Sequence, residues 1–235
     1  MYKIVQLLTR RPDLTPSEFQ TAWCSGGGVT RAPGLFRHVF NAPAGSDSPI
    51  QHAATATLDG LDELWFDDER AAANYFNSNA GGDRWWISSR SLLAEPGAPT
   101  VSGSALLIVE APAERIRLGI KLMILAQRRA DLTPTEFFEY WLRTHIPLAL
   151  QGPHTRERLL RLELCRPGAH RLTGLPMAPF DGISSMVFTS AADLQQEFES
   201  DYYRNVLAAD EPRFSDSARS RALFVNEILI YQRTG

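Results

Sequence analysis

Two stretches of the chain, "DLTPSEFQTAWCSGG" (13–27) and "DLTPTEFFEYWLRTH" (131–145), are versions of one pattern. When residues 3–27 are aligned with residues 121–145, 11 of the 25 positions are identical, at a constant offset of 118. Similarity at a long fixed offset is typical of a repeated domain. The two copies differ at their ends, where the second has His145 and the first has Gly27.

The similarity continues along both halves of the chain. "LDGLDELWF" (58–66) corresponds to "FDGISSMVF" (180–188), and "ALLIVEAP" (105–112) corresponds to "LFVNEILI" (223–230). The order of the matching segments is kept while the offset varies, so the loops differ in length and the structural elements do not. We place a boundary in the short polar segment "APAERIR" (111–117), which predicts two modules, 1–112 and 113–235.

The sequence of each module predicts the same order of elements: strand, helix, strand, strand, helix, strand. The first helix of each starts with a threonine N-cap (Thr15, Thr133), a proline in the first turn and a glutamate that completes a capping box (Glu18, Glu136). These identities are therefore structural, since an N-cap contributes about 1 kcal/mol to stability. A βαββαβ unit is the ferredoxin-like module, an antiparallel sheet with both helices on one face.

The other face of such a sheet needs apolar cover. Two copies in one chain predict that the two sheets pack face to face with four helices outside, an α+β fold equivalent to a single-chain dimeric α/β barrel.

The composition excludes several classes of protein. The net charge of −3 provides no field for nucleic acid or an anionic membrane, and hydrophobic residues make up an ordinary 44%. No apolar run reaches the roughly 20 residues of a membrane span. The N-terminal segment does not resemble a signal peptide, and Cys24 and Cys165 suggest neither a disulfide framework nor a metal knuckle. We expect a soluble cytoplasmic protein.

His145 is the main candidate for chemistry. Phe137, Trp141 and His145 are spaced i, i+4, i+8, so they share one face of the predicted helix. An imidazole there, with an ordinary pKa near 6.5, transfers protons at physiological pH. The alternative is that His145 caps the last helical turn just before Pro147.

Several other residues carry weaker candidate roles. Asp181 and Asp59 each precede a glycine, and an Asp-Gly pair is typical of a turn. For Asp181, the functional alternative is that it orients His145. Tyr140 and Tyr203 are either packing residues or donors to a substrate carbonyl. The arginine pairs 10–11 and 128–129 occur in both copies, which favours structural contacts over substrate binding.

The first module has candidates of its own. His38 alternates with Phe36 and Phe40, which predicts either a core histidine or the base of a second pocket. His52 falls in a loop. Glu63, if it faces inward, would have a raised pKa and would be a candidate base. The histidines lack metal-ligand spacing, and we predict no metal site.

The string "KLMILAQRRADLTPTEFFEYWLRTHIPLA" (121–149) resembles the signature of the EthD family, within the dimeric α/β-barrel superfamily. "FDGISSMVF" (180–188) and "LAADEPRFSDSARSRALFVNE" (207–227) are similar to the second half of the same family. The first module resembles it more weakly, and it departs at Gly27 and at "AEPGAPTVSG" (94–103). The resemblance implies a pocket between helix and sheet. It leaves the reaction open, because dehydratases, cyclases, isomerases, cofactor-free monooxygenases and haem enzymes share the superfamily.

These patterns predict a cofactor-independent lyase or isomerase that acts on an aromatic or polyketide-like carbonyl compound. His145 is the predicted base and acid, Tyr140 or Tyr203 holds the oxyanion, and Asp181 is an auxiliary residue. The alternatives are a non-catalytic binding protein for a hydrophobic metabolite and a haem protein. The predicted substrate-binding residues are Phe137, Trp141, Phe214, His38 and Glu63.

Overall fold

The computed structural model describes residues 1–25, 32–44, 54–76, 84–95, 97–168 and 172–234. The strands are β1 (Tyr2–Leu8), β2 (Leu35–Pro43), β3 (Ala54–Thr55), β4 (Gly60–Phe66), β5 (Thr100–Glu110), β6 (Ile120–Ala126), β7 (Leu159–Pro167), β8 (Gly182–Phe188) and β9 (Arg221–Gln232). The α-helices are α1 (Pro16–Ser25), α2 (Glu69–Phe76), α3 (Arg84–Ser89), α4 (Ala113–Ile116), α5 (Pro134–Tyr140), α6 (Ile146–Ala149), α7 (Thr155–Arg158), α8 (Ala191–Glu199) and α9 (Ala208–Asp210). The shorter 3₁₀ and π segments are η2 (Arg90–Leu92), η3 (Trp141–His145), η4 (Tyr203–Leu207) and η5 (Glu211–Arg213).

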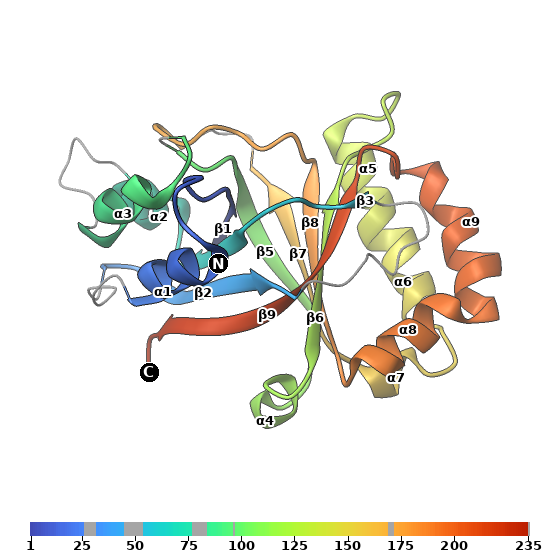
Figure 1. Cartoon of the computed structure of the whole chain (residues 1–235). Coiled ribbons are helices and arrows are strands. Elements are labelled where there is room, and N and C mark those ends of the chain that lie inside the picture. The colour runs from blue at the N-terminus through green and yellow to red at the C-terminus, as the bar shows by residue number, and fades with distance from the viewer. Residues whose placement is uncertain (26–31, 45–53, 77–83, 96, 169–171, 235) are drawn as a thin grey trace.

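Eight antiparallel strands close into one barrel, in the order β2-β4-β1-β5-β7-β8-β6-β9, with β9 pairing back to β2. The strand β3 adds to β9 in parallel. Helices α1, α2 and α3 lie on one side of the barrel, and α5, α6, α8 and α9 lie on the other (Figure 1). The strand order is the same in each half of the chain.

The expectation of two separate sheets packed face to face needs correction, because the sheets are joined at both edges. The strand β5 pairs with β1 through residues 100–104 and with β7 through residues 103–110. Likewise, β9 pairs with β6 through residues 221–225 and with β2 through residues 225–232. The last strand of each half is long enough to reach the opposite half, and this length closes the barrel.

The helix start shared by the two halves forms as the sequence predicts. The Thr133 side chain accepts a hydrogen bond from the backbone of Glu136, while the Glu136 carboxylate accepts one from the backbone of Thr133 at 2.8 Å. Thr15 and Glu18 form the same reciprocal pair. Both capping boxes are confirmed.

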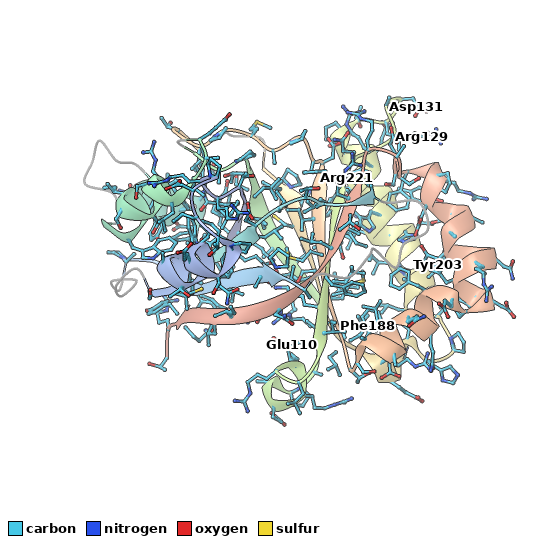
Figure 2. The ribbon with its side chains drawn as sticks, in the orientation of Figure 1. Glu110, Arg129, Asp131, Phe188, Tyr203 and Arg221 are labelled. Carbon is cyan, nitrogen blue, oxygen red and sulfur yellow. The ribbon has the colours of Figure 1, made fainter. Side chains whose placement is uncertain are left out.

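The arginines that follow the first strand of each half are structural, as predicted. Arg10 pairs with Asp59 at 2.9 Å, and Arg128 pairs with Asp181 at 3.2 Å, so each arginine ties the end of the first strand to the Asp-Gly turn. Arg129 and Asp131 lie together beside the start of α5 (Figure 2), with nitrogen–oxygen distances of 2.5 and 2.6 Å.

Charged residues fill part of the barrel interior and connect the two halves. Lys3 lies 2.6 Å from Glu63 and also bonds Glu163, while Lys121 bonds Glu63 and lies 2.9 Å from Glu227. Burial alone would raise the pKa of Glu63, but Lys121 and Lys3 reverse the effect and hold this pKa far below its usual value. The prediction of a raised pKa for Glu63 is therefore wrong. Glu63 is a structural anion at the centre of an ion-pair network.

Among the described residues, no helix combines the length and the apolar composition that crossing a membrane requires.

Candidate functional site

His145 ends a π turn in the middle of a longer helical segment. The chain runs from α5 through η3 and continues beyond His145 as α6. Pro147 follows two residues later, and a proline ring crowds the carbonyl four residues before it, which favours a wider turn at this point. His145 makes no capping hydrogen bond, so the interpretation of His145 as a helix cap is wrong.

The π turn determines where the imidazole lies. An α-helix has 3.6 residues per turn, so residues four positions apart do not lie directly above one another. Each is rotated slightly around the helix axis relative to the one before. A π turn takes more residues per turn, which keeps Trp141 and His145 more nearly in line on the face that meets the sheet.

A buried carboxylate orients the His145 ring. Nδ1 of His145 lies 3.0 Å from Oδ2 of Asp210, and the Tyr140 hydroxyl donates to Oδ1 of the same carboxylate at 2.6 Å. Burial lowers the pKa of His145, and Asp210 only partly opposes this effect. The imidazole is therefore neutral near pH 7, with its Nδ1 proton directed at Asp210 and its Nε2 lone pair available.

His145 lies at the boundary of two small chambers between the helices and the sheet. The first, of about 80 Å³, is largely apolar and contacts the inner sides of α6, α8 and the strands β7 and β8. The second, of about 60 Å³, includes the hydroxyls of Ser215, Ser217 and Ser220. Trp141, His145 and Glu211 line both chambers. The site thus offers mainly apolar space beside the imidazole, with a few polar side chains in the lining.

Two further acidic or phenolic groups face the apolar chamber. Tyr203, on the π turn η4, lies among the helices of the second half (Figure 2), and its hydroxyl donates to Oε1 of Glu211 at 2.9 Å. Burial and the neighbouring Glu211 raise the pKa of Tyr203, so the phenol stays protonated. Glu197 is 8% exposed and accepts a hydrogen bond from Thr155.

The predicted residues of the second half separate into two groups. Trp141 and Tyr203 line the apolar chamber, and Phe214 lines the polar one, with its ring centre 4.8 Å from that of His145. Phe137 is fully buried behind this wall, at 5.8 Å from Phe214. Asp181 contacts Arg128 and does not orient His145; Asp210 has that position.

In the first half, polar side chains occupy the corresponding face of the sheet. Gln6, His38 and Asp62 stand where the second half has Ile124, Leu162 and Ser184, all three of which line the apolar chamber. Nε2 of His38 lies 2.8 Å from Asp62, and the His38 ring packs edge-on against Trp85 with 4.7 Å between ring centres.

His38 is therefore a fully buried core residue, and Glu63 belongs to the barrel interior. Neither His38 nor Glu63 lies among the described residues that line the chambers around His145. Gly27 and His52 lie outside the described residues.

Sequence reasoning missed Asp210 and Glu211. Both fall in the segment 207–227 that resembles the EthD family, yet Asp210 is 65 positions from His145 and no local spacing links the two. The only signal is the pair of adjacent acidic residues in "AADEP" (208–212), a segment that also contains small and apolar residues.

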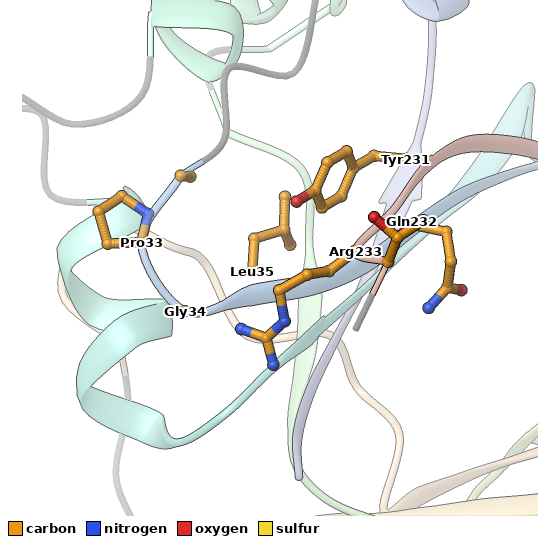
Figure 3. Close-up of a pocket in the computed structure, with 8 residues that line it drawn as sticks. Pro33, Gly34, Leu35, Tyr231, Gln232 and Arg233 are labelled. Carbon is orange, nitrogen blue, oxygen red and sulfur yellow. The ribbon is translucent and has the colours of Figure 1, made fainter.

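The structure also has a larger open groove, of about 560 Å³, which residues 32–35 and 231–234 line (Figure 3). Its Arg233 is engaged by Asp67 through two contacts of 2.6 and 2.9 Å. This groove is distant in the fold from the His145–Asp210 pair, and its geometry suggests no reaction.

Within the described part of the chain, no cluster of three or more histidine, cysteine, aspartate or glutamate side chains has the geometry to bind a metal ion.

Comparison with known proteins identifies one domain. Residues 129–218, in the second half of the chain, match the EthD domain model. This range includes His145, Tyr203, Asp210 and Glu211. The sequence matches no curated protein.

Solved structures share the fold at low sequence identity. An anthrone oxidase-like protein has a TM-score of 0.62 at 10% identity, covering 97% of this chain and 91% of that chain. A proposed monooxygenase from Fusobacterium nucleatum subsp. nucleatum has a TM-score of 0.56 at 10% identity, covering 99% and 97%. A variant chlorite dismutase from Candidatus Nitrospira defluvii has a TM-score of 0.51 at 13% identity, covering 95% and 90%. These likenesses show the barrel fold over nearly the whole chain.

Proposed function

We propose that this EthD-domain protein is a cofactor-independent lyase or isomerase that acts on an aromatic or polyketide-like carbonyl compound. The observation that carries the proposal is the buried His145 held by Asp210 at the boundary of two chambers. A buried imidazole that lines a cavity and has one nitrogen fixed by a carboxylate is arranged to act as a general base.

In the proposed reaction, Nε2 of His145 removes a proton from the carbon beside the substrate carbonyl, and the bond electrons move to the carbonyl oxygen. Asp210 stabilises the imidazolium that forms. His145 then returns the proton, either to a departing hydroxyl group, which leaves as water, or to another carbon, which shifts the double bond. No net oxidation or reduction takes place.

The two tyrosines have different roles in this proposal. The Tyr140 hydroxyl already donates to Asp210, so Tyr140 positions the carboxylate and does not hold the oxyanion. Tyr203 lines the apolar chamber and keeps its proton, so it remains a candidate donor to the substrate oxygen once its bond to Glu211 rearranges. Ser217, in the second chamber, is the other candidate, because the Ser215 and Ser220 hydroxyls already donate to backbone carbonyls.

Hydrogen–deuterium exchange tests the proposed base without knowledge of the natural substrate. Aromatic methyl ketones are incubated with the protein in D₂O, and loss of the signal of the protons beside the carbonyl is followed by NMR. We expect catalysed exchange, which His145→Ala lowers by about 10²-fold or more. The matched control is His154→Ala, since His154 is 57% exposed and distant from Asp210. Full exchange by His145→Ala would overturn the proposal.

The two alternatives have less support. A non-catalytic binding protein needs an apolar cavity but no shifted proton-transfer groups, whereas His145 and Tyr203 both have shifted pKa values beside the chambers. The chambers of about 60 and 80 Å³ would have to open much further for a haem macrocycle than for a single ring. The absorption spectrum after haem addition tests the second alternative, and a Soret shift would support it.

We further propose that the chain is a tandem of two ferredoxin-like modules, 1–112 and 113–235. The equal strand orders, the two capping boxes and the two arginine–aspartate contacts support this duplication. In this proposal the second module has the working site, and the first module completes the barrel.

A further inference from the structure

The apolar chamber beside His145 has a polar pair in its lining, Thr155 and Glu197. Within the described part of the chain, these two side chains line this chamber and not the other. Helix α6 follows His145 directly, lines the chamber through Ile146 and Ala149, and extends about 6 Å along its axis before the chain turns towards Thr155. His145 and the Thr155–Glu197 pair therefore lie at different ends of the apolar chamber.

The Thr155–Glu197 pair is buried and held in place. Thr155 is 4% exposed and Glu197 is 8% exposed, and the Thr155 hydroxyl donates to Oε1 of Glu197. The backbone of Gly152 packs against both, because a Cβ atom there would collide with the Thr155 hydroxyl and lie 2.8 Å from Oε1 of Glu197. Arg158 provides a compensating cation, with Nη1 3.7 Å from Oε2 of Glu197. The carboxylate therefore has a fixed position and a balanced charge.

These contacts leave hydrogen-bonding capacity on the Glu197 carboxylate. A carboxylate accepts about four hydrogen bonds, and the contact of 3.7 Å with Arg158 is longer than a hydrogen bond. Among the side chains that the structure describes, Thr155 is the one that donates to this carboxylate within hydrogen-bond distance, and its hydroxyl proton is used in doing so. The pair thus offers acceptors, which suit a hydroxyl group of a ligand and do not suit an ether or a carbonyl oxygen.

The first half of the chain indicates that the fold itself does not require a carboxylate at this position. At the offset of 122 that aligns β4 with β8, Glu197 corresponds to Tyr75 and Phe198 corresponds to Phe76. Tyr75 is 3% exposed and packs against the rings of Phe66 and Phe76. Because burial of a carboxylate is costly, an aromatic side chain is the cheaper way to fill this position. A ligand hydroxyl gives the carboxylate a purpose that packing does not.

Deepening the proposed function, on which this inference rests, we propose that the substrate is a short-chain carbonyl compound with a hydroxyl group at its far end. Its carbonyl end lies at His145, where the two chambers meet, and its hydroxyl donates to Glu197. Glu197 is the specificity-determining residue, and Thr155 positions its carboxylate. Apolar side chains such as those of Leu162 and Met186, which also line the chamber, contact the chain between the two ends.

N-(2-hydroxyethyl)acetamide and N-propylacetamide test this selection, because they have the same chain length and differ only in a terminal hydroxyl or methyl group. Binding of each is measured by NMR titration of the protein. For the native protein we expect the hydroxyethyl compound to bind at least about tenfold more tightly, since a site that hydrogen-bonds a hydroxyl rejects an analogue that lacks it. In Glu197→Met, which removes the acceptor and keeps the side-chain length, we expect the propyl compound to bind more tightly.

Two further variants complete the test. Glu197→Gln keeps an acceptor for Thr155 and removes the charge, so we expect the native ratio of affinities to fall at least about threefold. Glu199→Gln is the matched control, because Glu199 is an exposed residue of the same helix and is not among the described residues that line the chambers; it should keep the native ratio. Thermal unfolding verifies that each variant is folded.

Three results would overturn the inference. They are equal binding of the two amides to the native protein, a ratio that neither folded Glu197 variant changes, and no binding of either amide. A Glu197 that serves only to hold α7 against α8 would give the second result, with a lower unfolding temperature and an unchanged ratio.

The binding measurement separates this inference from the proposed reaction. The protons beside an amide carbonyl are much less acidic than those of a ketone, so no turnover enters the titration. Equal binding of the two amides together with His145-dependent deuterium exchange of ketones would reject the hydroxyl selection alone. Selective binding together with full exchange by His145→Ala would reject the proton transfer alone.

Discussion

At the scale of single residues, the site depends on a contact between two side chains from distant parts of the chain. His145 is buried among Trp141 and Phe214, and an imidazole in such surroundings would adopt either tautomer without a partner. Asp210 selects the tautomer with the proton on Nδ1, and Tyr140 holds Asp210 in place. The chemistry therefore resides in this group of three residues more than in His145 alone.

Asp210→Asn tests the orienting role. The amide keeps the size of the carboxylate but removes the charge that stabilises imidazolium, so we expect deuterium exchange to fall by about 10²-fold or more. The pKa of His145 should fall further, because Asp210 raises it in the folded protein. NMR titration of the histidine ring measures this shift. Asp201→Asn, at a side chain that is 93% exposed, is the control and should change neither quantity.

The pH dependence of exchange has a defined direction. Because the pKa of His145 is lowered from 6.5 in the folded protein, the base stays neutral at pH 7 and the rate should decline only below pH 6.5. The unfolded chain binds this proton more readily, so the contribution of His145 to stability also falls as the pH drops below 6.5. A rate profile measured between about pH 4.5 and 8.5 tests this expectation, and an acid limb centred above 6.5 would contradict it.

Part of the site could be predicted from the sequence. The helical spacing of Phe137, Trp141 and His145 placed the histidine on the face that meets the sheet, because that argument needs only local periodicity. For an orienting carboxylate the sequence offered only Asp181, as the alternative to a turn role, whereas the structure has Asp210 in this position. A contact across 65 positions depends on how η3 and α9 pack, which no local pattern encodes.

At the scale of elements, the π turn η3 connects the helix start to the site. Thr133 and Pro134 fix where α5 begins, and both halves of the chain share that signal. The turn from Trp141 to His145 then carries one residue more than an α-helix would need. The sequence predicted the capping boxes and the strands of the barrel correctly, but helix propensity does not distinguish a π turn from an α-helix.

Deletion of Arg143 tests whether the extra residue matters. Its side chain is 77% exposed, so removing it should allow η3 to become regular α-helix with little loss of packing. His145 would then rotate away from Asp210, and we expect deuterium exchange to decline by at least about tenfold while the circular dichroism spectrum stays native. Arg143→Ala, which keeps the chain length, should retain the native rate. Equal rates for both variants would show that the π turn is dispensable.

At the scale of the whole molecule, the charged interior of the barrel joins the two halves. Glu63 lies between Lys3 and Lys121, one from each half, and all three side chains are buried. The sequence left open whether Glu63 faces inward. It also could not show that two lysines from different strands converge on Glu63, because this depends on how the halves pack. A buried carboxylate in this position holds two cations, and its removal leaves both undercompensated.

Glu63→Gln should therefore destabilise the protein by about 3–5 kcal/mol, the usual cost of breaking a buried ion pair. Urea unfolding measures the free energy of unfolding, with Glu157→Gln, at a side chain that is 81% exposed, as the surface control. Deuterium exchange by the folded variant should be unchanged, because Glu63 lines neither chamber. A loss below about 1 kcal/mol would mean that the network contributes little to stability.

The same network predicts acid sensitivity. Burial alone would raise the pKa of Glu227, but Lys121, Arg161 and Arg37 lower it from 4.5 to about 2. A carboxylate with a lowered folded-state pKa contributes stability above its unfolded value and loses that stability as the pH falls through its folded value. We expect the free energy of unfolding to decrease between pH 4.5 and about 2, as followed by urea unfolding at each pH. Glu227→Gln should flatten this decrease.

The two seams that close the barrel, β5 with β7 and β9 with β2, lie within a single chain. In a barrel assembled from two subunits, closure is a bimolecular event, and dilution opens it by mass action. Here the partner surface of each half is tethered by the short segment around α4, so its effective concentration is independent of how much protein is present. The integrity of the barrel, and of the chambers beside it, should thus survive dilution that would separate a two-subunit barrel.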